Sequence, residues 1–356
     1  MTTDDMDMQA GDQTPEHTAA DNSVTPETSF TQNLSFERVN NDLIWVADKV
    51  NLVREELAKF IIGQHEIVEL LIAGIFANGH VLLEGVPGVA KTLASKVLAK
   101  TLNVAFSRIQ FTPDLMPSDV LGTSVFNMKE SQFFFKKGPI FANIVLIDEI
   151  NRAPAKTQAS LFEVMEERQI TYDGVRYPMA FPFLVVATQN PVDSEGTYNL
   201  PEAQLDRFLF KIKIDYPNLE QEEDILRRYK NQIGSADLTK IQAVFSSNEL
   251  EKIHTVMEDI IIEDHLLKYI AAITHRTRSH GKLFLGASPR ASLAMLRAAK
   301  AIAAIRGRDF VTPEDIRFVT VPVLNHRLIL TPEAEMEGFS SEDVIREIVE
   351  SIEVPR

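Results

Sequence analysis

The sequence predicts an α/β protein with a parallel sheet and a phosphate-binding loop, followed by a smaller all-helical domain. Three observations lead to this fold class. Between about residue 81 and residue 232, apolar strand-like runs alternate with helical patterns, and this alternation is typical of βαβ units in a parallel sheet. A glycine-containing loop joins the first of these strands to the helix after it. Beyond residue 231 the strand patterns stop and helical patterns take over.

The strands are predicted from short apolar runs, because strands buried on both faces of a sheet have no polar side. These runs cover residues 81–83, 104–109, 144–147, 184–187 and 208–214. The helical patterns between them cover residues 91–102, 155–168 and 220–232. The sheet is therefore expected to be parallel, with helices as crossovers.

Two insertions, residues 125–137 and 170–177, interrupt the alternation and are predicted to project as β elements. The second contains Asp173 and Gly174, a pair that favours the tight turn of a hairpin. The first carries three consecutive phenylalanines, residues 133–135. They leave two interpretations open, which are packing in the core and a surface that contacts a substrate or a neighbouring subunit.

Three regions are predicted along the chain. Residues 1–36 contain acidic and small polar residues but no Lys or Arg, and too little apolar surface to offset the entropy of ordering, so they are predicted to be a disordered tail. A helical pattern at 41–60 opens the α/β domain, which is expected to span 37–232. Residues 233–356 form the predicted helical domain, with helices at 248–256, 262–279, 288–306 and 313–321.

Composition excludes several classes of function. The 356 residues are 45% hydrophobic and 24% charged, with no Cys, so disulfides, thiolate metal sites and Cys nucleophiles are ruled out. A net charge of −15 argues against general binding of nucleic acid, which needs a basic face. No apolar run approaches the ~20 residues of a membrane span, and the start of the chain is acidic, unlike a signal peptide. We therefore expect a cytoplasmic protein without membrane insertion.

The loop after the first strand has the composition of a phosphate-binding loop. Its residues are Gly85, Val86, Pro87, Gly88, Val89, Ala90, Lys91 and Thr92. Small residues allow backbone N–H groups to surround phosphates, Lys91 can reach the β and γ oxygens, and the Thr92 hydroxyl can ligate Mg²⁺. Ala90 departs from the usual motif, which has Gly before the lysine.

A second candidate element follows the apolar run at 144–147. Asp148 and Glu149 come directly after this run, at the carboxyl end of a strand, where α/β sheets bind ligands. Asp148 is predicted to hold Mg²⁺, and Glu149 to orient and activate the attacking water. The alternative is that these carboxylates only begin a loop or cap the next helix.

Further motifs extend the pattern at residues 148–153, 187–191, 196–208 and 288–290. Together with the phosphate-binding loop they resemble the AAA+ ATPases, and specifically the MoxR family, in which Ala at position 90 is usual. The resemblance covers about residues 61–330. It implies a P-loop NTPase core of AAA+ type with β-hairpin insertions, a helical lid domain, and ATP and Mg²⁺ as ligands.

The resemblance also implies roles for individual residues. Asn190 matches sensor 1, which helps to place the lytic water; the alternative is ordinary turn chemistry. Arg207 matches the arginine finger that enters the next subunit's site; the alternative is a salt bridge within the chain. Arg290 matches sensor 2, which contacts the γ-phosphate of its own subunit. Ile62 and Gly63 match the segment that lines the adenine pocket; the alternative is a simple helix break.

The function implied by the resemblance is hydrolysis of ATP in a homo-oligomeric ring, usually of six subunits, to remodel or mature a client protein. A partner with a von Willebrand factor A (VWA) domain is expected. Two alternatives stay open: a nucleotide-gated scaffold with little turnover, and a magnesium-chelatase-like ATPase subunit.

Overall fold

The computed structural model describes residues 26–86, 88–89, 91–190, 198, 200–230 and 237–355. The chain separates into two units, residues 1–38 and 39–356, and the elements discussed below belong to the second. Helix α1 (Pro26–Ala58) begins in the first unit. Residues 1–25 of the tail predicted at 1–36 lie outside the described residues. Residues 26–36 are described, and they are helical. No helix in these ranges has both the length and the apolar character needed to cross a membrane.

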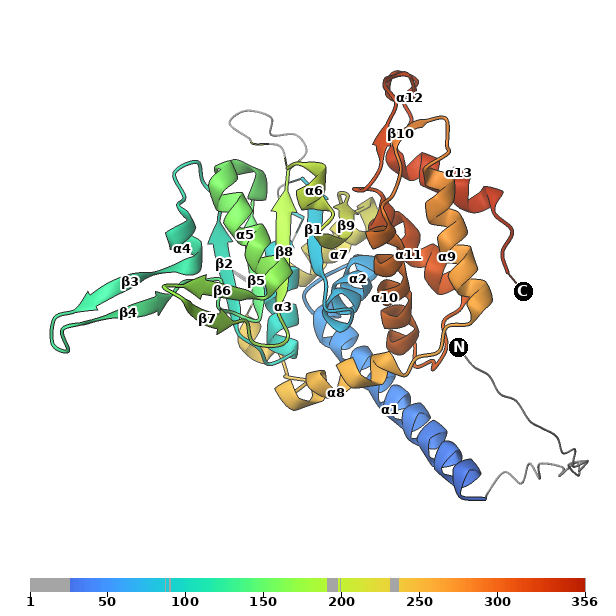
Figure 1. The fold of residues 1–356 in the computed structure, drawn as a ribbon, viewed down its shortest axis with the longest axis horizontal. Coiled ribbons are helices and arrows are strands. Elements are labelled where there is room, and N and C mark those ends of the chain that lie inside the picture. Colours follow the sequence, from blue (N-terminus) through green and yellow to red (C-terminus); the bar gives the residue numbers. More distant parts are fainter. Residues whose placement is uncertain are drawn as a thin grey trace, which may run out of the picture. The chain divides into compact units, whose positions relative to one another are not determined.

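A five-stranded parallel sheet forms the centre of the α/β region, as predicted (Figure 1). Its strands are β1 (His80–Gly85), β2 (Phe106–Gln110), β5 (Ile144–Asp148), β8 (Leu184–Gln189) and β9 (Phe208–Ile214). Their order is β2-β5-β8-β1-β9. Every residue of β5 is buried, which explains why its first four residues, Ile144 to Ile147, form an unbroken apolar run.

The sheet has a hydrophobic core on each face. Successive strand residues point to opposite sides, so Val81 and Leu83 join one core cluster, whereas Leu82 joins the other. The helices of this region are α2 (His65–Phe76), α3 (Lys91–Thr101), α4 (Pro117–Leu121), α5 (Ala155–Glu167), α6 (Glu202–Leu205) and α7 (Leu219–Tyr229), with a short 3₁₀ helix η1 (Ile150–Arg152). Helices α2 and α3 contribute to the first cluster, and α5 contributes to the second.

Both predicted insertions are antiparallel hairpins. They are β3 (Gly122–Asn127) with β4 (Gln132–Lys137), and β6 (Gln169–Tyr172) with β7 (Val175–Pro178). Asp173 and Gly174 have φ of 49° and 77°, as the tight hairpin turn requires. In Figure 1 the β3–β4 hairpin extends away from the strands of the central sheet.

The phenylalanines of the β3–β4 hairpin do not pack in the core. Phe133 is 71% exposed and Phe134 is 48% exposed, so core packing is the wrong interpretation for both. Phe135 instead packs against the second hairpin, with its ring centroid 4.9 Å from that of Tyr172 and 4.6 Å from that of Tyr177. Aromatic stacking therefore joins the two hairpins.

The C-terminal region is mainly helical. Its elements are η2 (Leu238–Lys240), α8 (Ser247–Glu258), α9 (Asp264–Thr277), α10 (Pro289–Ile305), α11 (Pro313–Leu324), α12 (Pro332–Met336) and α13 (Ser341–Ser351), with strands β10 (Leu283–Leu285) and β11 (Ile329–Leu330). The antiparallel pair β10–β11 corrects the expectation of an all-helical domain; both strands are apolar, but runs of two or three residues are too short to be recognised as strands. The predicted boundary at 232/233 lies outside the described residues.

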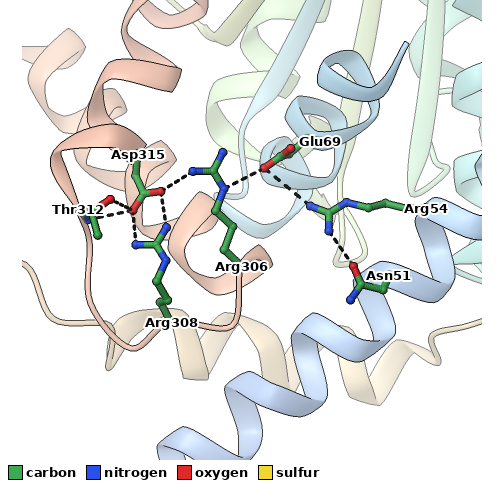
Figure 2. Close-up of polar contacts among 7 residues, drawn as sticks. All are labelled: Asn51, Arg54, Glu69, Arg306, Arg308, Thr312 and Asp315. Atoms are coloured by element: carbon green, nitrogen blue, oxygen red, sulfur yellow. Dashed lines mark hydrogen bonds and ion pairs between the residues drawn. The ribbon is translucent and has the colours of Figure 1, made fainter. Parts of the chain in front are cut away.

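A chain of ion pairs joins this region to the α/β region (Figure 2). The Asp315 carboxylate is fully buried and accepts from Arg306 at 2.9 Å and from both terminal nitrogens of Arg308 at 2.6 and 2.8 Å. Arg306 also contacts Glu69 on α2, which lies 3.7 Å from Arg54 on α1. Buried carboxylates require such pairing, because an isolated charge is costly to remove from water.

Candidate active site

The candidate active site lies at the carboxyl ends of β1, β5 and β8. Because these strands are parallel and adjacent, the residues that follow them meet at one edge of the sheet. A cavity of about 180 Å³ opens there. It is lined by Gly88, Lys91, Thr92, Arg108, Gln110, Asp148, Glu149, Thr188 and Asn190. Six residues predicted from the sequence as a nucleotide site are therefore brought together: Gly88, Lys91, Thr92, Asp148, Glu149 and Asn190.

The loop after β1 requires glycine at two points. A Cβ at Gly85 would lie 2.5 Å from the Ile214 carbonyl oxygen of the neighbouring strand, so only glycine fits there without displacing the backbone. Gly88 has a φ of 91°, in the region that other residues rarely adopt. Val86 and Val89 are described, whereas Pro87 and Ala90 lie outside the described residues.

Lys91 is the first residue of α3, and its ammonium group points back into the loop. Nζ donates to the Gly85 carbonyl oxygen at 2.6 Å. Partial burial lowers the pKa of Lys91, and the nearby carboxylates of Asp148, Glu149 and Glu84 oppose this shift. The same carboxylates would attract Mg²⁺, so the site combines a fixed cation with oxygen donors for a second one.

Asp148 is buried at the end of β5 and is held by two contacts. Arg108 Nε lies 2.6 Å from Asp148 Oδ2, and the Thr188 hydroxyl donates to Oδ1 at 3.4 Å. Both partners come from the adjacent strands β2 and β8. The carboxylate is thus fixed on either side and faces the cavity with Thr92.

Glu149 has a strained backbone and an anchored side chain. Its φ and ψ of 59° and 54° are left-handed, a conformation that costs of order 1–3 kcal/mol for a residue with a side chain. Its backbone N–H donates to the Thr188 hydroxyl at 3.0 Å. Its Oε2 accepts from Gln110 at 2.7 Å and lies 3.2 Å from Arg152 Nε. The strain therefore sits at the residue that was predicted to activate water.

Ile62 and Gly63 line a second cavity, of about 200 Å³. Gly63 has a φ of 75°, and a Cβ there would lie 2.2 Å from Gln221 Nε2. Gln64 lines the same cavity and donates to the Val89 carbonyl of the phosphate-binding loop at 3.2 Å. Its Oε1 is buried and has no hydrogen-bond partner in the described structure.

Arg207 and Arg290 lie elsewhere, in a cavity of about 470 Å³. Arg207 Nη1 donates to the Phe162 carbonyl at 2.8 Å, and both arginines contact Glu166. Neither arginine lines the cavity around Lys91. Arg290 lies beside Arg207 around Glu166; the contact with the γ-phosphate of its own subunit, which the resemblance implied, stays a prediction.

Sequence reasoning missed four residues that now contact predicted ones: Arg108, Gln110, Thr188 and Gln64. Arg108 and Gln110 are two residues apart in β2, so their side chains lie on the same face of the strand. This spacing can be recognised in the sequence. Their relevance depends on β2 lying beside β5, with Gln110 in register with Asp148. Strand order could not be derived from one sequence.

The parallel sheet, the loop after β1 and the carboxylates after β5 define the nucleotide-binding domain of an AAA-type ATPase. Residues 80–210 match the model of the ATPase family associated with various cellular activities, and residues 275–348 match that of the AAA lid domain. The chain belongs to the MoxR family of AAA+ ATPases.

Similarity to individual relatives extends over most of the chain. The chain is 43% identical over 317 residues to Chaperone MoxR1 of Mycobacterium tuberculosis. This match covers 85% of the chain and 81% of the relative. The chain is 31% identical over 327 residues to Protein MoxR of Methylorubrum extorquens. This match covers 84% of the chain and 93% of the relative. A crystal structure of a candidate ATPase from Cytophaga hutchinsonii has a TM-score of 0.84 and 42% identity, and covers 91% of this chain and 100% of its own.

Proposed function

We propose that this protein hydrolyses ATP to ADP and phosphate, with Mg²⁺, in an oligomeric ring and uses the reaction to remodel or mature a client protein. The observation that carries the proposal is the single cavity of about 180 Å³ that brings Lys91 and Thr92 together with Asp148 and Glu149. These groups supply a phosphate-binding cation, two Mg²⁺ ligands and a general base.

Each residue around this cavity has a proposed task. Lys91 binds the β and γ phosphates, and Asn190 helps to place the lytic water beside Glu149. Thr92 and Asp148 hold Mg²⁺, directly or through water; the ion supplies charge neutralisation at the phosphates when it is bound. Glu149 accepts a proton from the water.

Under this proposal two sets of contacts would have to change before turnover. Gln110 donates to Glu149 Oε2, and Arg152 lies near the same oxygen. A carboxylate that accepts these contacts is less available as a base, so Glu149 has to exchange Gln110 for water during catalysis. Lys91 must likewise exchange the Gly85 carbonyl for phosphate oxygens.

The cavity at Ile62 and Gly63 is the proposed site for adenine. Gln64 joins this cavity to the phosphate-binding loop through its bond to Val89. The loop that follows β9 forms its opposite wall, with Tyr216 and Pro217. Backbone atoms at residues 62 and 63 would bind the base.

Arg207 and Arg290 are proposed to act on the nucleotide of a neighbouring subunit. Neither lines the nucleotide cavity of its own chain, and both line one cationic cavity. A guanidinium can stabilise the charge that develops on the transferred phosphoryl group. An isolated subunit would then have an incomplete site, and assembly, as a ring of six in this family, would be part of the mechanism.

The client function rests on the family. The relative from Mycobacterium tuberculosis is named a chaperone, and we extend that class of function to this chain, with a VWA-domain protein as the proposed partner. The exposed phenylalanines of the β3–β4 hairpin offer apolar contact area for a polypeptide.

The test is steady-state ATP hydrolysis with Mg²⁺ as a function of protein concentration. The variants are Glu149→Gln and Arg207→Ala, with Arg227→Ala on the exposed face of α7 as the control. Turnover should rise cooperatively with concentration. It should fall about 10²-fold or more in Glu149→Gln and about 10³-fold in Arg207→Ala, with binding of a fluorescent ATP analogue and oligomer size unchanged. Binding without turnover in the native chain, also with a VWA partner, would instead support the nucleotide-gated scaffold.

A further inference from the structure

Glu166 lies between the two arginines proposed to act on the neighbouring subunit. Its Oε1 is 3.2 Å from Arg290 Nη2, and its Oε2 is 3.5 Å from Arg207 Nη1. Arg207 directly precedes β9, whereas Arg290 belongs to the first turn of α10. One carboxylate on α5 therefore joins a residue of the sheet domain to a residue of the C-terminal helices.

The surroundings of Glu166 are strongly cationic. Five arginines line the cavity: Arg168, Arg207, Arg290, Arg297 and Arg327. Two carboxylates face them, and Asp206 is engaged by Arg327, whose Nε lies 2.7 Å from Asp206 Oδ1. Burial lowers the pKa of Arg297, and Glu166 opposes that shift. Glu166 is thus the carboxylate in this cavity that offsets repulsion between Arg207 and Arg290.

Arg207 is incompletely held by its other contacts. Its Nη1 donates to the Phe162 carbonyl at 2.8 Å. Its Nε is buried and has no hydrogen-bond partner in the described structure. A buried donor without a partner is destabilising, so the backbone carbonyl alone leaves the guanidinium incompletely satisfied. The charge of Glu166 adds the attraction that keeps Arg207 beside Arg290.

We propose that Glu166 is a positioning residue that holds Arg207 and Arg290 as one pair for the nucleotide phosphates of a second copy of this chain. The inference rests on the proposed function, because it requires both arginines to act between subunits. Donors that are fixed before the transition state forms need no reorganisation when charge develops. Without the carboxylate, two like charges on separate domains would move apart.

The first experiment compares Glu166→Gln with Glu167→Gln in the full-length protein. Glu167 is the adjacent exposed residue of α5 and provides the matched control. For Glu166→Gln we expect kcat for ATP to fall about tenfold, with the affinity for a fluorescent ATP analogue, ring size and melting temperature unchanged. Glu167→Gln should match the native chain. Equal kcat in the two variants, or a fall in kcat that is explained by lost assembly, would overturn the inference.

The second experiment places Glu166→Gln in a background that lacks both arginines, Arg207→Ala/Arg290→Ala. If Glu166 acts through these two arginines, adding Glu166→Gln should change kcat by no more than about twofold. A further tenfold loss would show an independent role and contradict the proposal. If Arg207→Ala is inactive while Glu166→Gln is normal, the inference fails and the proposed function stands. If Arg207→Ala turns over at the native rate, action between subunits fails, and the inference fails with it.

Discussion

Glu69 and Arg306 are 237 residues apart in the chain, yet Arg306 Nε lies 3.3 Å from Glu69 Oε1. The contact joins α2 to the residue that follows α10 (Figure 2). Helix α2 begins directly after the cavity at Ile62 and Gly63, and Arg290 lies in the first turn of α10. The two proposed nucleotide-contacting regions are thus connected by two helices and one ion pair.

The stability of this connection depends on Asp315. Asp315→Asn would remove the charge that pairs with Arg306 and Arg308 and leave their guanidinium groups without a buried counter-ion. We expect the free energy of unfolding to fall by about 3 kcal/mol, as for other broken buried pairs. Urea unfolding measures this change, with Glu314→Gln at the adjacent exposed position as the control. A loss below about 0.5 kcal/mol would mean that the network contributes little.

The strands of the sheet could be predicted from sequence because each is a short apolar run in a fully buried layer. Lys91, Asp148 and Glu149 could be predicted for a related reason, since they follow such runs where parallel strands must bring them together. The contacts of Arg108 and Gln110 depend on strand order, which no local pattern encodes. The meeting of Arg207 and Arg290 at Glu166 likewise depends on how the C-terminal helices pack against the α/β region.

Two other differences have local causes. The phenylalanines at 133–135 have the composition of a core strand, but they lie on a two-stranded hairpin on which Phe133 is left 71% exposed by the described residues. The pair β10–β11 consists of three and two residues, which is too short to produce a periodic signal. In both cases tertiary context decided the outcome.

Two buried histidines should make the fold less stable in acid. Burial, assisted by Arg168, lowers the pKa of His80 to about 3, and burial with Arg327 lowers the pKa of His326 well below its usual value. The unfolded chain has a histidine pKa near 6.5, so below that pH it binds protons that the folded state does not. The contribution of the two neutral histidines to the free energy of unfolding is therefore fully present above about pH 6.5. As the pH decreases below this value, the free energy of unfolding should fall by about 1.4 kcal/mol per pH unit for each histidine.

His80→Gln tests this assignment. The Val185 N–H donates to His80 Nδ1, and Nε2 bonds to the Met165 carbonyl, both at 3.0 Å; a glutamine amide can supply the same acceptor and donor. Urea unfolding measures the free energy of unfolding at pH 7.5 and at pH 5.5. The decrease in this free energy between the two pH values should be about 1.4 kcal/mol smaller in the variant than in the native chain. Equal losses in both proteins would exclude His80 as a source of the acid sensitivity.

The cavity at residues 62 and 63 should be sensitive to one methyl group. In Gly63→Ala the new Cβ would overlap Gln221, and the φ of 75° would strain any side chain. Because Gln221 lines the cavity, its displacement should weaken ATP binding about tenfold, or about 1.4 kcal/mol. Isothermal titration calorimetry with a slowly hydrolysed ATP analogue measures the change. Gly281→Ala is the control, since a Cβ there meets no atom within 4 Å; similar affinities in both variants would argue against a nucleotide at this cavity.

Two phenylalanines of the β3–β4 hairpin, Phe133 and Phe135, should differ sharply in their response to loss of the ring. Phe135→Ala removes the contacts with Tyr172 and Tyr177, and we expect it to destabilise the protein by about 1–2 kcal/mol. Phe133→Ala removes a ring that is 71% exposed, so its effect on unfolding should stay within about 0.5 kcal/mol. If the exposed ring serves a client, Phe133→Ala should instead weaken binding of an unfolded polypeptide, measured by fluorescence anisotropy, at unchanged ATP turnover. A stability loss in Phe133→Ala equal to that in Phe135→Ala would show that the first hairpin is covered in solution.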